Sequence, residues 1–360
     1  MRTKIGIVTG GGDCPGLNAV IRAVVKAATR HNWETLGFLG GYDGMLEPRR
    51  YRRLDYRDVG GLLQRGGTIL GTGNRGRFAA KVGHGEAQRI PTEVLDGAKR
   101  GCEALGLSAV IAIGGDGSLS IAQQLHEHGI PIVGVPKTID NDLAATVMTF
   151  GFDSAVACAT DALDRLHSTA ESHQRVMVLE VMGRYAGWIA IYAGIAGGAD
   201  VILMPEIPFR YEGISAKIAE REQAGRHFSI VVVAEGARPE GGEFVTISAE
   251  RQDREARLGG IGAQVAAEIE RRTGKETRVV VLGHLQRGGA PTNFDRALCT
   301  LFGTTAVELI AARQFGQMVT YTGAQVSSVP LADAIGHLRR VPLDSGFVRA
   351  ARALGICLGD

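Results

Sequence analysis

Continuous apolar runs that alternate with amphipathic stretches constrain the fold of this 360-residue chain more than any other feature. The runs are short, rich in β-branched residues and apolar throughout, at residues 4–9, 109–114, 131–135, 175–181, 200–206, 228–236 and 278–284. Strands buried on both faces of a sheet have this composition. Helical patterns follow, at residues 16–30, 118–128, 153–171, 185–196, 213–224, 258–272 and 295–312. The alternation predicts an α/β fold of mostly parallel sheets with helices on both faces, whose ligands bind at the carboxyl ends of the strands.

The charges are balanced and interspersed, with a formal net charge of +2. This gives no electrostatic basis for wrapping nucleic acid or coating an anionic membrane, so we expect neither partner. The N-terminal apolar stretch is too short for a secretory signal, and no run of about eighteen apolar residues occurs. The five cysteines are scattered, without a CxxC pair or metal-ligand spacing. These features predict a cytoplasmic protein. Any anionic ligand must be bound by groups at its own site, because the overall charge is small.

Glycine is over-represented, at 51 of 360 residues, and gathers in short clusters after the apolar runs. The first cluster, TGGGDCPG at residues 9–16, follows the first predicted strand and precedes a helical pattern. Successive backbone N–H groups in such a loop, with a helix N-terminus behind them, can surround a phosphate. A tight turn without a ligand is the alternative, and the loop lacks the GK[ST] ending of a Walker A motif.

A second cluster, GGDGS at residues 114–118, again ends a strand and opens a helix. Its Asp116 lies among glycines, and a carboxylate beside amides that face phosphates can hold Mg²⁺. The alternative for Asp116 is to cap the helix, a role for which Ser118 competes. Two such loops together favour a nucleoside triphosphate with magnesium over structural turns.

The stretch GTGNRG at residues 71–76 matches the dinucleotide-binding fingerprint. It lacks the preceding strand and the following helix that this fingerprint requires, so a dehydrogenase is only an alternative interpretation. Its basic residues matter more, because Arg75 or Arg77 could reach a nucleotide phosphate.

An acidic segment, PKTIDND at residues 136–142, follows the predicted strand at 131–135. If the segment is extended, Asp140 and Asp142 point the same way and Asn141 points opposite. One acid can then accept a hydroxyl proton while the other orients the hydroxyl or helps to hold metal. An Asx-rich turn is the alternative.

Basic side chains also fall at the ends of later predicted strands, at Arg175, Arg184, Arg278, His284 and Arg287. Isolated arginines are usually solvated surface charges, which is the alternative for each of them. Several at strand–loop junctions instead suggest a pocket for a phosphorylated substrate, because guanidinium groups match phosphate oxygens.

In this order and spacing the motifs resemble the phosphofructokinase family over almost the full chain. The segments that carry the resemblance are TGGGDCPGLNAVIR, GGTILGT, IGGDGS, PKTIDND, SHQR, EVMGRYAGWIA, AEG, TRVVVLGHLQRGG and PTNFDR. The resemblance implies two Rossmann-like domains with mostly parallel sheets and the active site in the cleft between them. Residues 1–150 with 291–338 would form a larger nucleotide-binding domain, and residues 151–290 with 339–360 a smaller sugar-phosphate-binding domain. It also implies a glycolytic enzyme that is a homo-oligomer, usually a tetramer.

The resemblance further implies roles for single residues in phosphoryl transfer from ATP to fructose 6-phosphate. Asp140 resembles the base that takes the 1-hydroxyl proton, with Thr138 and Asp142 beside it, and Arg184 resembles a group that stabilises the transferring phosphoryl. The nucleotide and magnesium positions, with Asp116 as metal ligand, match Gly11, Arg75, Gly76, Gly115, Asp116, Gly117 and Ser118. The sugar-phosphate positions match Thr138, Asp140, Arg175, Met182, Gly183, Arg184, Glu235, Arg278, His284 and Arg287. Among these, Arg175 and Arg278 match residues that reach a neighbouring subunit's site.

Two positions bear on the phosphoryl donor, because the family contains ATP-dependent and pyrophosphate-dependent enzymes. Pyrophosphate users typically have GGDD, whose second acid fills and repels the space of an α-phosphate, together with a lysine in PKTIDND. Here Gly117 is ATP-like and Lys137 is pyrophosphate-like. Because a lysine can also serve the β- and γ-phosphates of ATP, we predict ATP as the donor and keep pyrophosphate as the alternative. The acceptor range, for example toward sedoheptulose 7-phosphate, stays open, whereas a non-catalytic sensor would lack the base that Asp140 supplies.

Overall fold

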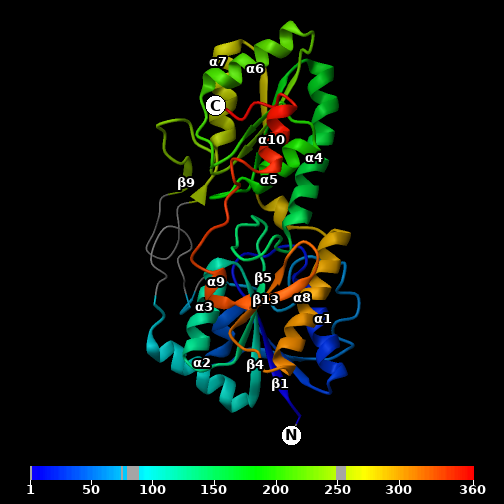
Figure 1. Cartoon of the computed structure of the whole chain (residues 1–360), viewed down its shortest axis with the longest axis vertical. Coiled ribbons are helices and arrows are strands. Elements are labelled where there is room, and N and C mark those ends of the chain that lie inside the picture. The colour runs from blue at the N-terminus through cyan, green and yellow to red at the C-terminus, as the bar shows by residue number, and fades with distance from the viewer. Residues whose placement is uncertain (1, 74–75, 79–88, 249–256) are drawn as a thin grey trace. The chain divides into compact units, whose positions relative to one another are not determined.

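The computed structural model describes residues 2–73, 76–78, 89–248 and 257–360. The chain forms two compact units, each built from two segments: Met1–Ser154 with Arg287–Leu338, and Ala155–Gln286 with Arg339–Asp360. The chain thus builds most of the first unit, then most of the second, returns to the first and ends in the second, as the colour order in Figure 1 shows. Each unit has its own sheet and its own buried core.

The first unit is built on a seven-stranded sheet in the order β13-β12-β5-β4-β1-β2-β3. Its inner strands run parallel, and they are β1 (Lys4–Thr9), β2 (Glu34–Phe38), β4 (Leu107–Gly114), β5 (Ile132–Pro136) and β12 (Gln317–Tyr321). The edge strands β3 (Tyr51–Leu54) and β13 (Val326–Pro330) pair antiparallel with their neighbours. Parallel pairing requires crossover connections, and the helices of this unit supply them.

Helices cover both faces of this sheet, with α1 (Leu17–Arg30) and α8 (Asn293–Ala311) on one face and α2 (Thr92–Leu105) and α3 (Asp116–Glu127) on the other (Figure 1). Helices α1 and α8 approach closely because position 303 is glycine. A Cβ there would stand 2.6 Å from the Cβ of Ala23. The short helices η1 (Gly41–Met45) and α9 (Leu331–Ala334) also belong to this unit.

One buried carboxylate fixes where two helices begin. Asp295, in the first turn of α8, is fully buried and accepts hydrogen bonds from Gly151 N (3.0 Å), Ser154 N (2.9 Å) and Ser154 Oγ (2.6 Å). These groups lie at the start of α4 (Phe152–His173). Burial raises the pKa of Asp295 to about 6 despite these bonds. The aspartate of PTNFDR is therefore a structural group that joins α4 to α8.

The second unit is built on a four-stranded parallel sheet in the order β11-β6-β8-β7. The strands are β6 (Val176–Val181), β7 (Val201–Leu203), β8 (Ser229–Ala234) and β11 (Thr277–Val281). Helices α6 (Tyr211–Gln223) and α7 (Ile261–Thr273) bury one face, whereas α5 (Trp188–Ala196) packs against β7, β8 and α10 (Gly346–Ala353). The unit also holds most of α4, a small antiparallel pair, β9 (Thr246–Ser248) with β10 (Arg257–Leu258), and most of the turn η2 (Gly283–Arg287).

The prediction of an α/β fold with mostly parallel sheets is confirmed. Each of the seven apolar runs contains a strand, and each predicted helical stretch contains a helix. The sequence pattern missed the inner strands β2 and β12, the edge strands, the β9–β10 pair, and the helices α2 (Thr92–Leu105), α9 and α10. Within the described parts of the chain, every helix is too short or too polar to cross a membrane.

Candidate active site

Three loops gather at one edge of the first unit's sheet. They follow β1, β4 and β5, which are neighbours in the sheet and run parallel. The register pairs Thr9 with Ile113 and Ile113 with Val135, so the three strands end side by side. The two glycine clusters and the acidic segment, which are far apart in the sequence, therefore meet at the edge where parallel sheets bind ligands.

The first glycine loop lies directly on the second. Gly10 N donates to Ile113 O at 2.9 Å, and Gly11 has a left-handed φ of 76°. A Cβ at Gly10 would stand 2.6 Å from Ser118 Oγ, so a side chain there would force the two loops apart. Glycine at this position thus lets both backbones approach the same space, as a phosphate-binding loop requires.

The second loop opens α3, and its acid is not the cap of that helix. The N-cap is Gly115, which makes no side-chain capping bond, and Asp116 is the first helical residue. One carboxylate oxygen of Asp116, Oδ1, accepts from Gly336 N at 2.9 Å. The alternative interpretation of Asp116 as an N-cap is therefore wrong. An acid in the first turn is favoured by the helix dipole, and its other oxygen adds a hard ligand near the loops.

Lys137 connects the two glycine loops. Its backbone N donates to Gly114 O at 2.9 Å, and its ammonium Nζ donates to Gly12 O in the first loop. The side chain is 4% exposed, and burial lowers the pKa of Lys137. The lysine therefore places positive charge between two loops whose amides can bind phosphate. This position suits a longer phosphate chain and a shorter one equally well.

The acidic segment forms a turn rather than an extended strand. Asn141 has a φ of 51°, in the left-handed region, so the alternation that the extended conformation would give does not apply. Asp140 N donates to Thr138 Oγ1 at 3.1 Å. Burial and the nearby charge of Asp140 raise the pKa of Asp142 to about 7, while a hydrogen bond from Thr138 opposes the rise. The turn thus brings the two acids together around the threonine hydroxyl, and the charge of Asp116 is close enough to act on Asp142 as well.

In the second unit, three loops likewise meet at the carboxyl edge of the sheet. Val181 of β6 pairs with Ala234 of β8, and Glu180 pairs with Val281 of β11. The residues that follow these strands are Met182, Gly183, Arg184, Glu235 and His284. The sequence predicted these side chains as one group, and the strand register brings their loops to the same edge.

Close backbone packing holds this edge together. Gly183 has a φ of 139° and accepts from Gly236 N at 3.1 Å, and a Cβ at Gly236 would collide with Arg184 O. Met182 N donates to Oε1 of Gln286, a fully buried side chain, at 2.7 Å. Gly236 and Gln286 were missed as positioning residues because their role depends on backbone approach, which no spacing in the sequence reveals.

Comparison with known proteins identifies the family. Residues 4–310 match the family described as Phosphofructokinase. The chain belongs to the phosphofructokinase family. The family predicted from the motifs is thus confirmed.

Relatives within the phosphofructokinase family include users of both phosphoryl donors. The chain is 54% identical to an ATP-dependent 6-phosphofructokinase of Chloroflexus aurantiacus, over 100% of this chain and 98% of that protein. It is 51% identical to a pyrophosphate–fructose 6-phosphate 1-phosphotransferase of Amycolatopsis methanolica, over 94% of this chain and 96% of that protein. A crystal structure of Pichia pastoris phosphofructokinase in the T-state has a TM-score of 0.79 at 32% identity. That match covers 93% of this chain and 37% of the yeast chain.

Two arginines of the phosphofructokinase motifs lie at the opposite edge of the second sheet. Arg175 precedes β6 and Arg278 is the second residue of β11, and both pair with Glu276, Arg175 through Nε at 2.6 Å. The six residues of β6 span about 20 Å. Arg175 and Arg278 thus lie at the amino ends of strands whose carboxyl ends carry Arg184 and His284, so these two pairs of basic groups lie apart within one chain.

Arg287 lies with the glycine loop of the first unit. Its Nη1 donates to Asp13 O at 3.2 Å, and a Cβ at Gly12 would collide with the guanidinium group. Of the predicted nucleotide contacts, Gly76 has a left-handed φ of 116° beside Asp43, whereas Arg75 lies outside the described residues.

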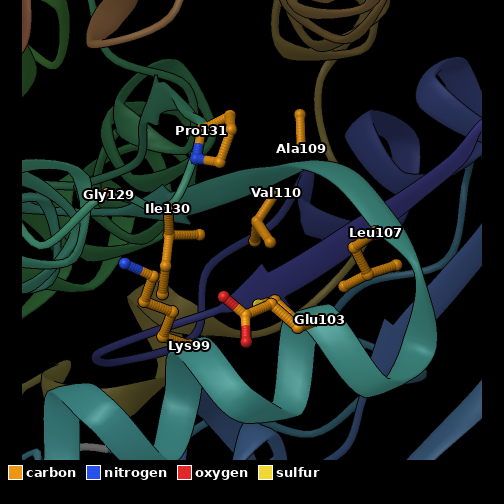
Figure 2. Close-up of a pocket in the computed structure, with 9 residues that line it drawn as sticks. Lys99, Glu103, Leu107, Ala109, Val110, Gly129, Ile130 and Pro131 are labelled. Atoms are coloured by element: carbon orange, nitrogen blue, oxygen red, sulfur yellow. The ribbon is translucent and has the colours of Figure 1, made fainter.

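The first unit also has two hollows that the sequence did not indicate. One, of about 480 Å³, lies between α2 and α3 and is lined by Arg89, Ile90, Thr92, Leu95, Ser120, Gln123, Gln124, Glu127, His128 and Ile335. The other, of about 60 Å³, lies at the opposite end of β4, where Figure 2 shows Lys99 and Glu103 beside Val110 and Ile130. Only the larger hollow is close to the glycine loops, because its Ser120 is one helical turn from Gly117.

A magnesium ion would have few protein ligands here. Among the described residues, no group of three or more His, Cys, Asp or Glu side chains could hold a metal ion. Mg²⁺ is commonly held by one or two carboxylates together with substrate phosphates and water. Asp116 fits that ligand set because its carboxylate lies at the glycine loops, at the start of α3. One of its two oxygens, Oδ1, accepts from Gly336 N, and the other is the one proposed to bind the metal.

Proposed function

We propose that this chain is an ATP-dependent 6-phosphofructokinase, which transfers the γ-phosphoryl group of ATP to the 1-hydroxyl of D-fructose 6-phosphate and gives fructose 1,6-bisphosphate and ADP. The observation that carries this proposal is the meeting of two glycine loops and an acid turn at the ends of β1, β4 and β5. A phosphate chain between the loops would lie beside a proton acceptor. Phosphoryl transfer needs this positioning and charge neutralisation more than covalent help from the protein.

Each group in the first unit has a place in this reaction. The backbone amides of the glycine loops and the ammonium group of Lys137 would hold the phosphate chain, with Asp116 as the protein ligand of Mg²⁺. Bound magnesium would neutralise charge on the phosphate oxygens. Asp140 would accept the proton of the attacking hydroxyl, and Thr138 and Asp142 would support it. Gly11, Gly76, Gly115, Gly117 and Ser118 complete the proposed nucleotide site.

ATP is favoured over pyrophosphate by two features of α3. Gly117 has no side chain to fill or repel the space of an α-phosphate. The hollow of about 480 Å³ begins one turn farther along the same helix and is large enough for a nucleoside, which pyrophosphate lacks. Lys137 supports either donor because its ammonium group bonds to the first glycine loop. Pyrophosphate stays the second candidate, since a pyrophosphate-dependent relative is 51% identical.

We assign the sugar phosphate to the second unit. Met182, Gly183, Arg184, Glu235 and His284 would bind fructose 6-phosphate, Arg184 would also stabilise the transferring phosphoryl, and Arg287 would contact the sugar phosphate from the first unit. Arg175 and Arg278 would serve the site of a neighbouring subunit, which their place at the amino ends of β6 and β11 supports. The proposal therefore includes a cytoplasmic homo-oligomer, most simply a tetramer, in which each sugar site is completed by a second chain.

Product analysis tests the proposal directly. The purified chain is incubated with ATP, Mg²⁺ and fructose 6-phosphate, and the phosphorus NMR spectrum is followed. We expect loss of the γ-phosphate signal of ATP, gain of ADP and a new sugar 1-phosphate signal. Persistence of the γ-phosphate signal, with all components present, would contradict the proposed function.

A further inference from the structure

The loop that carries the acids is closed by two buried side chains that lie outside the proposed ligand contacts. These are Asn141, 1% exposed, and Thr149, fully buried. Thr149 N donates to Asn141 Oδ1 at 3.0 Å, and Asn141 Nδ2 donates to Val147 O at 3.4 Å. The amide of Asn141 therefore reaches across the loop from residue 141 to residues 147–149.

The hydroxyl of Thr149 holds the start of the acid turn. Thr149 Oγ1 is 2.7 Å from Thr138 O and 3.4 Å from Asn141 Oδ1. A hydroxyl has one proton to donate, and the shorter distance assigns it to the Thr138 carbonyl. Thr138 in turn accepts from Asp140 N through its own hydroxyl. One continuous chain of bonds thus runs from Thr149 to the backbone of Asp140.

Asn141 also sets the conformation between the two acids. Its φ of 51° is costly for most residues and least costly for glycine and for Asn or Asp. The left-handed residue turns the chain between Asp140 and Asp142, and the bonds of its side chain hold that conformation in a buried place. We call these bonds, together with the bond from Thr149 to Thr138, the loop clamp.

The far part of the loop is anchored separately. Val147 N donates to Tyr321 O at 2.9 Å, Tyr321 N donates to Thr146 Oγ1 at 3.1 Å, and the Thr320 hydroxyl donates to Ala145 O. These bonds attach residues 145–147 to β12 but do not touch residues 138–142. The loop clamp is what joins the acid turn to this anchored part.

We propose that Asn141 and Thr149 are positioning residues for the phosphoryl transfer, which hold the turn of Thr138, Asp140 and Asp142 in the geometry that places the base at the attacking hydroxyl. The inference rests on the proposed function. A proton acceptor must stand within hydrogen-bond reach of the hydroxyl, and a misplacement of about 1 Å can cost about 100-fold in rate. Both side chains are buried and bond to the protein's own groups, so we expect their loss to affect the chemical step more than substrate binding.

A pair of substitutions at Thr149 tests the loop clamp in the full-length enzyme. Thr149→Val removes the hydroxyl at nearly constant shape, whereas Thr149→Ser keeps it. We expect Thr149→Val to lower kcat about 10- to 100-fold with KM values for both substrates within about threefold of wild type, and Thr149→Ser to recover most of kcat. The matched control is Thr273→Val, which removes a half-buried hydroxyl that donates to Ile269 O at 2.7 Å in α7. The control should keep the wild-type kcat. A Thr149→Val enzyme with wild-type kcat, or a Thr149→Ser enzyme as slow as Thr149→Val, would overturn the inference.

A second measurement reads the loop clamp without turnover, so that its failure and that of the proposed function are separate. Hydrogen exchange is compared in wild type and Asn141→Gly, which keeps the left-handed conformation but loses the side-chain bonds. We expect faster exchange of the Thr149 amide, while the Val147 amide, bonded to Tyr321 O, stays protected. An unchanged Thr149 amide would overturn the loop clamp even in an active enzyme. A wild-type protein inactive with every donor would instead contradict the proposed function.

Discussion

The two units place their functional side chains in different ways. In the first unit the two glycine loops, Lys137 and the acid turn are joined by hydrogen bonds to one another at a single edge of the sheet. In the second unit the predicted sugar-phosphate groups lie at both edges, with Arg184 at one and Arg175 and Arg278 at the other. A single chain can therefore complete the proposed donor site, whereas the proposed acceptor site needs residues that one chain holds apart.

The largest effect is expected in the first unit, at the base. Asp140→Asn removes the proton acceptor while keeping its size, so kcat should fall on the order of 10²- to 10⁴-fold with little change in either KM. Steady-state kinetics with saturating ATP and fructose 6-phosphate measures this. Full activity in Asp140→Asn would remove the acid turn from the mechanism and with it the claim that the first unit carries the chemistry.

Donor selection should be decided in the same unit. Gly117→Asp places a carboxylate where the α-phosphate of ATP would lie, and like charges brought together at a binding site cost several kcal/mol, so kcat/KM for ATP should fall about 100-fold or more. Gly115→Ala serves as a control for added bulk at the same loop. Unchanged ATP kinetics in Gly117→Asp would eliminate the steric and charge argument for the donor.

Substitutions among the proposed sugar-phosphate residues should change the KM for fructose 6-phosphate rather than kcat. Arg278→Ala and Arg175→Ala each remove a charge-assisted partner for phosphate, so KM for fructose 6-phosphate should rise about 10- to 100-fold while KM for ATP stays within a factor of about three. A rise in the KM for ATP as well would show that these arginines do not act only at the sugar-phosphate site.

Mixed oligomers can show which chain's site Arg278 serves. If Arg278 serves a neighbouring chain, oligomers assembled from Asp140→Asn and Arg278→Ala chains contain some sites with both residues intact. Their activity should exceed the sum of the two single variants. Activity equal to that sum would mean that Arg278 acts only within its own chain or not at all.

The smallest effect is a shift in pH dependence. Burial and the charge of Asp140 raise the pKa of Asp142 to about 7, so the acid pair keeps a proton until near neutrality. Because the base must be ionised, kcat/KM should rise with pH through about 7 rather than near the usual value of about 4 for an aspartate. Asp142→Asn removes the neighbouring charge and should move this limb to lower pH by about one unit or more. An unchanged acidic side of the kcat/KM–pH profile in Asp142→Asn would mean that the charge of one acid does not affect the pKa of the other.

The same raised pKa has a consequence for stability. The folded state binds the proton of Asp142 more tightly than the unfolded chain does, so this group stabilises the fold most at low pH. That contribution should decrease as the pH rises through about 7. Asp142→Asn should flatten this part of the dependence of the unfolding free energy on pH, which chemical denaturation at pH 6 and pH 8 can measure.

The sequence predicts the strands β1, β4 and β5 and the four strands of the second sheet because their segments are apolar nearly throughout. It does not predict the inner strands β2 (ETLGF) and β12 (QMVTY), which contain polar residues. Edge strands gave no such signal: β3 (Tyr51–Leu54) exposes its first three residues, and β13 (Val326–Pro330) is only partly buried. Helix α2 (Thr92–Leu105) was missed because it begins after a glycine-rich, polar stretch without a strong apolar run. Sequence patterning thus predicts strands with a continuous apolar run and misses strands whose apolar residues are interrupted by polar ones.

The candidate site was predictable where chemistry fixes residue type and not where backbone geometry decides. Asp116 and the acids could be named from their motifs, but the left-handed Asn141 overturned the extended conformation from which their shared direction was inferred. The hydrogen bond from Lys137 to Gly12 spans 125 positions in the sequence, and no local sequence pattern predicts it. Arg175 and Arg278 begin the apolar runs at 175–181 and 278–284, so their place at the amino ends of strands could be predicted, whereas the contact of both with Glu276 could not.

The proposed donor site of the first unit favours ATP over pyrophosphate. The most direct test is the ratio of kcat/KM for ATP to kcat/KM for pyrophosphate, measured on the wild-type enzyme with saturating fructose 6-phosphate and magnesium. We predict a ratio of about 100 or more in favour of ATP, because only ATP has a nucleoside to bind along α3 and no side chain at Gly117 opposes its α-phosphate. Turnover with pyrophosphate and none with ATP would contradict the proposed donor.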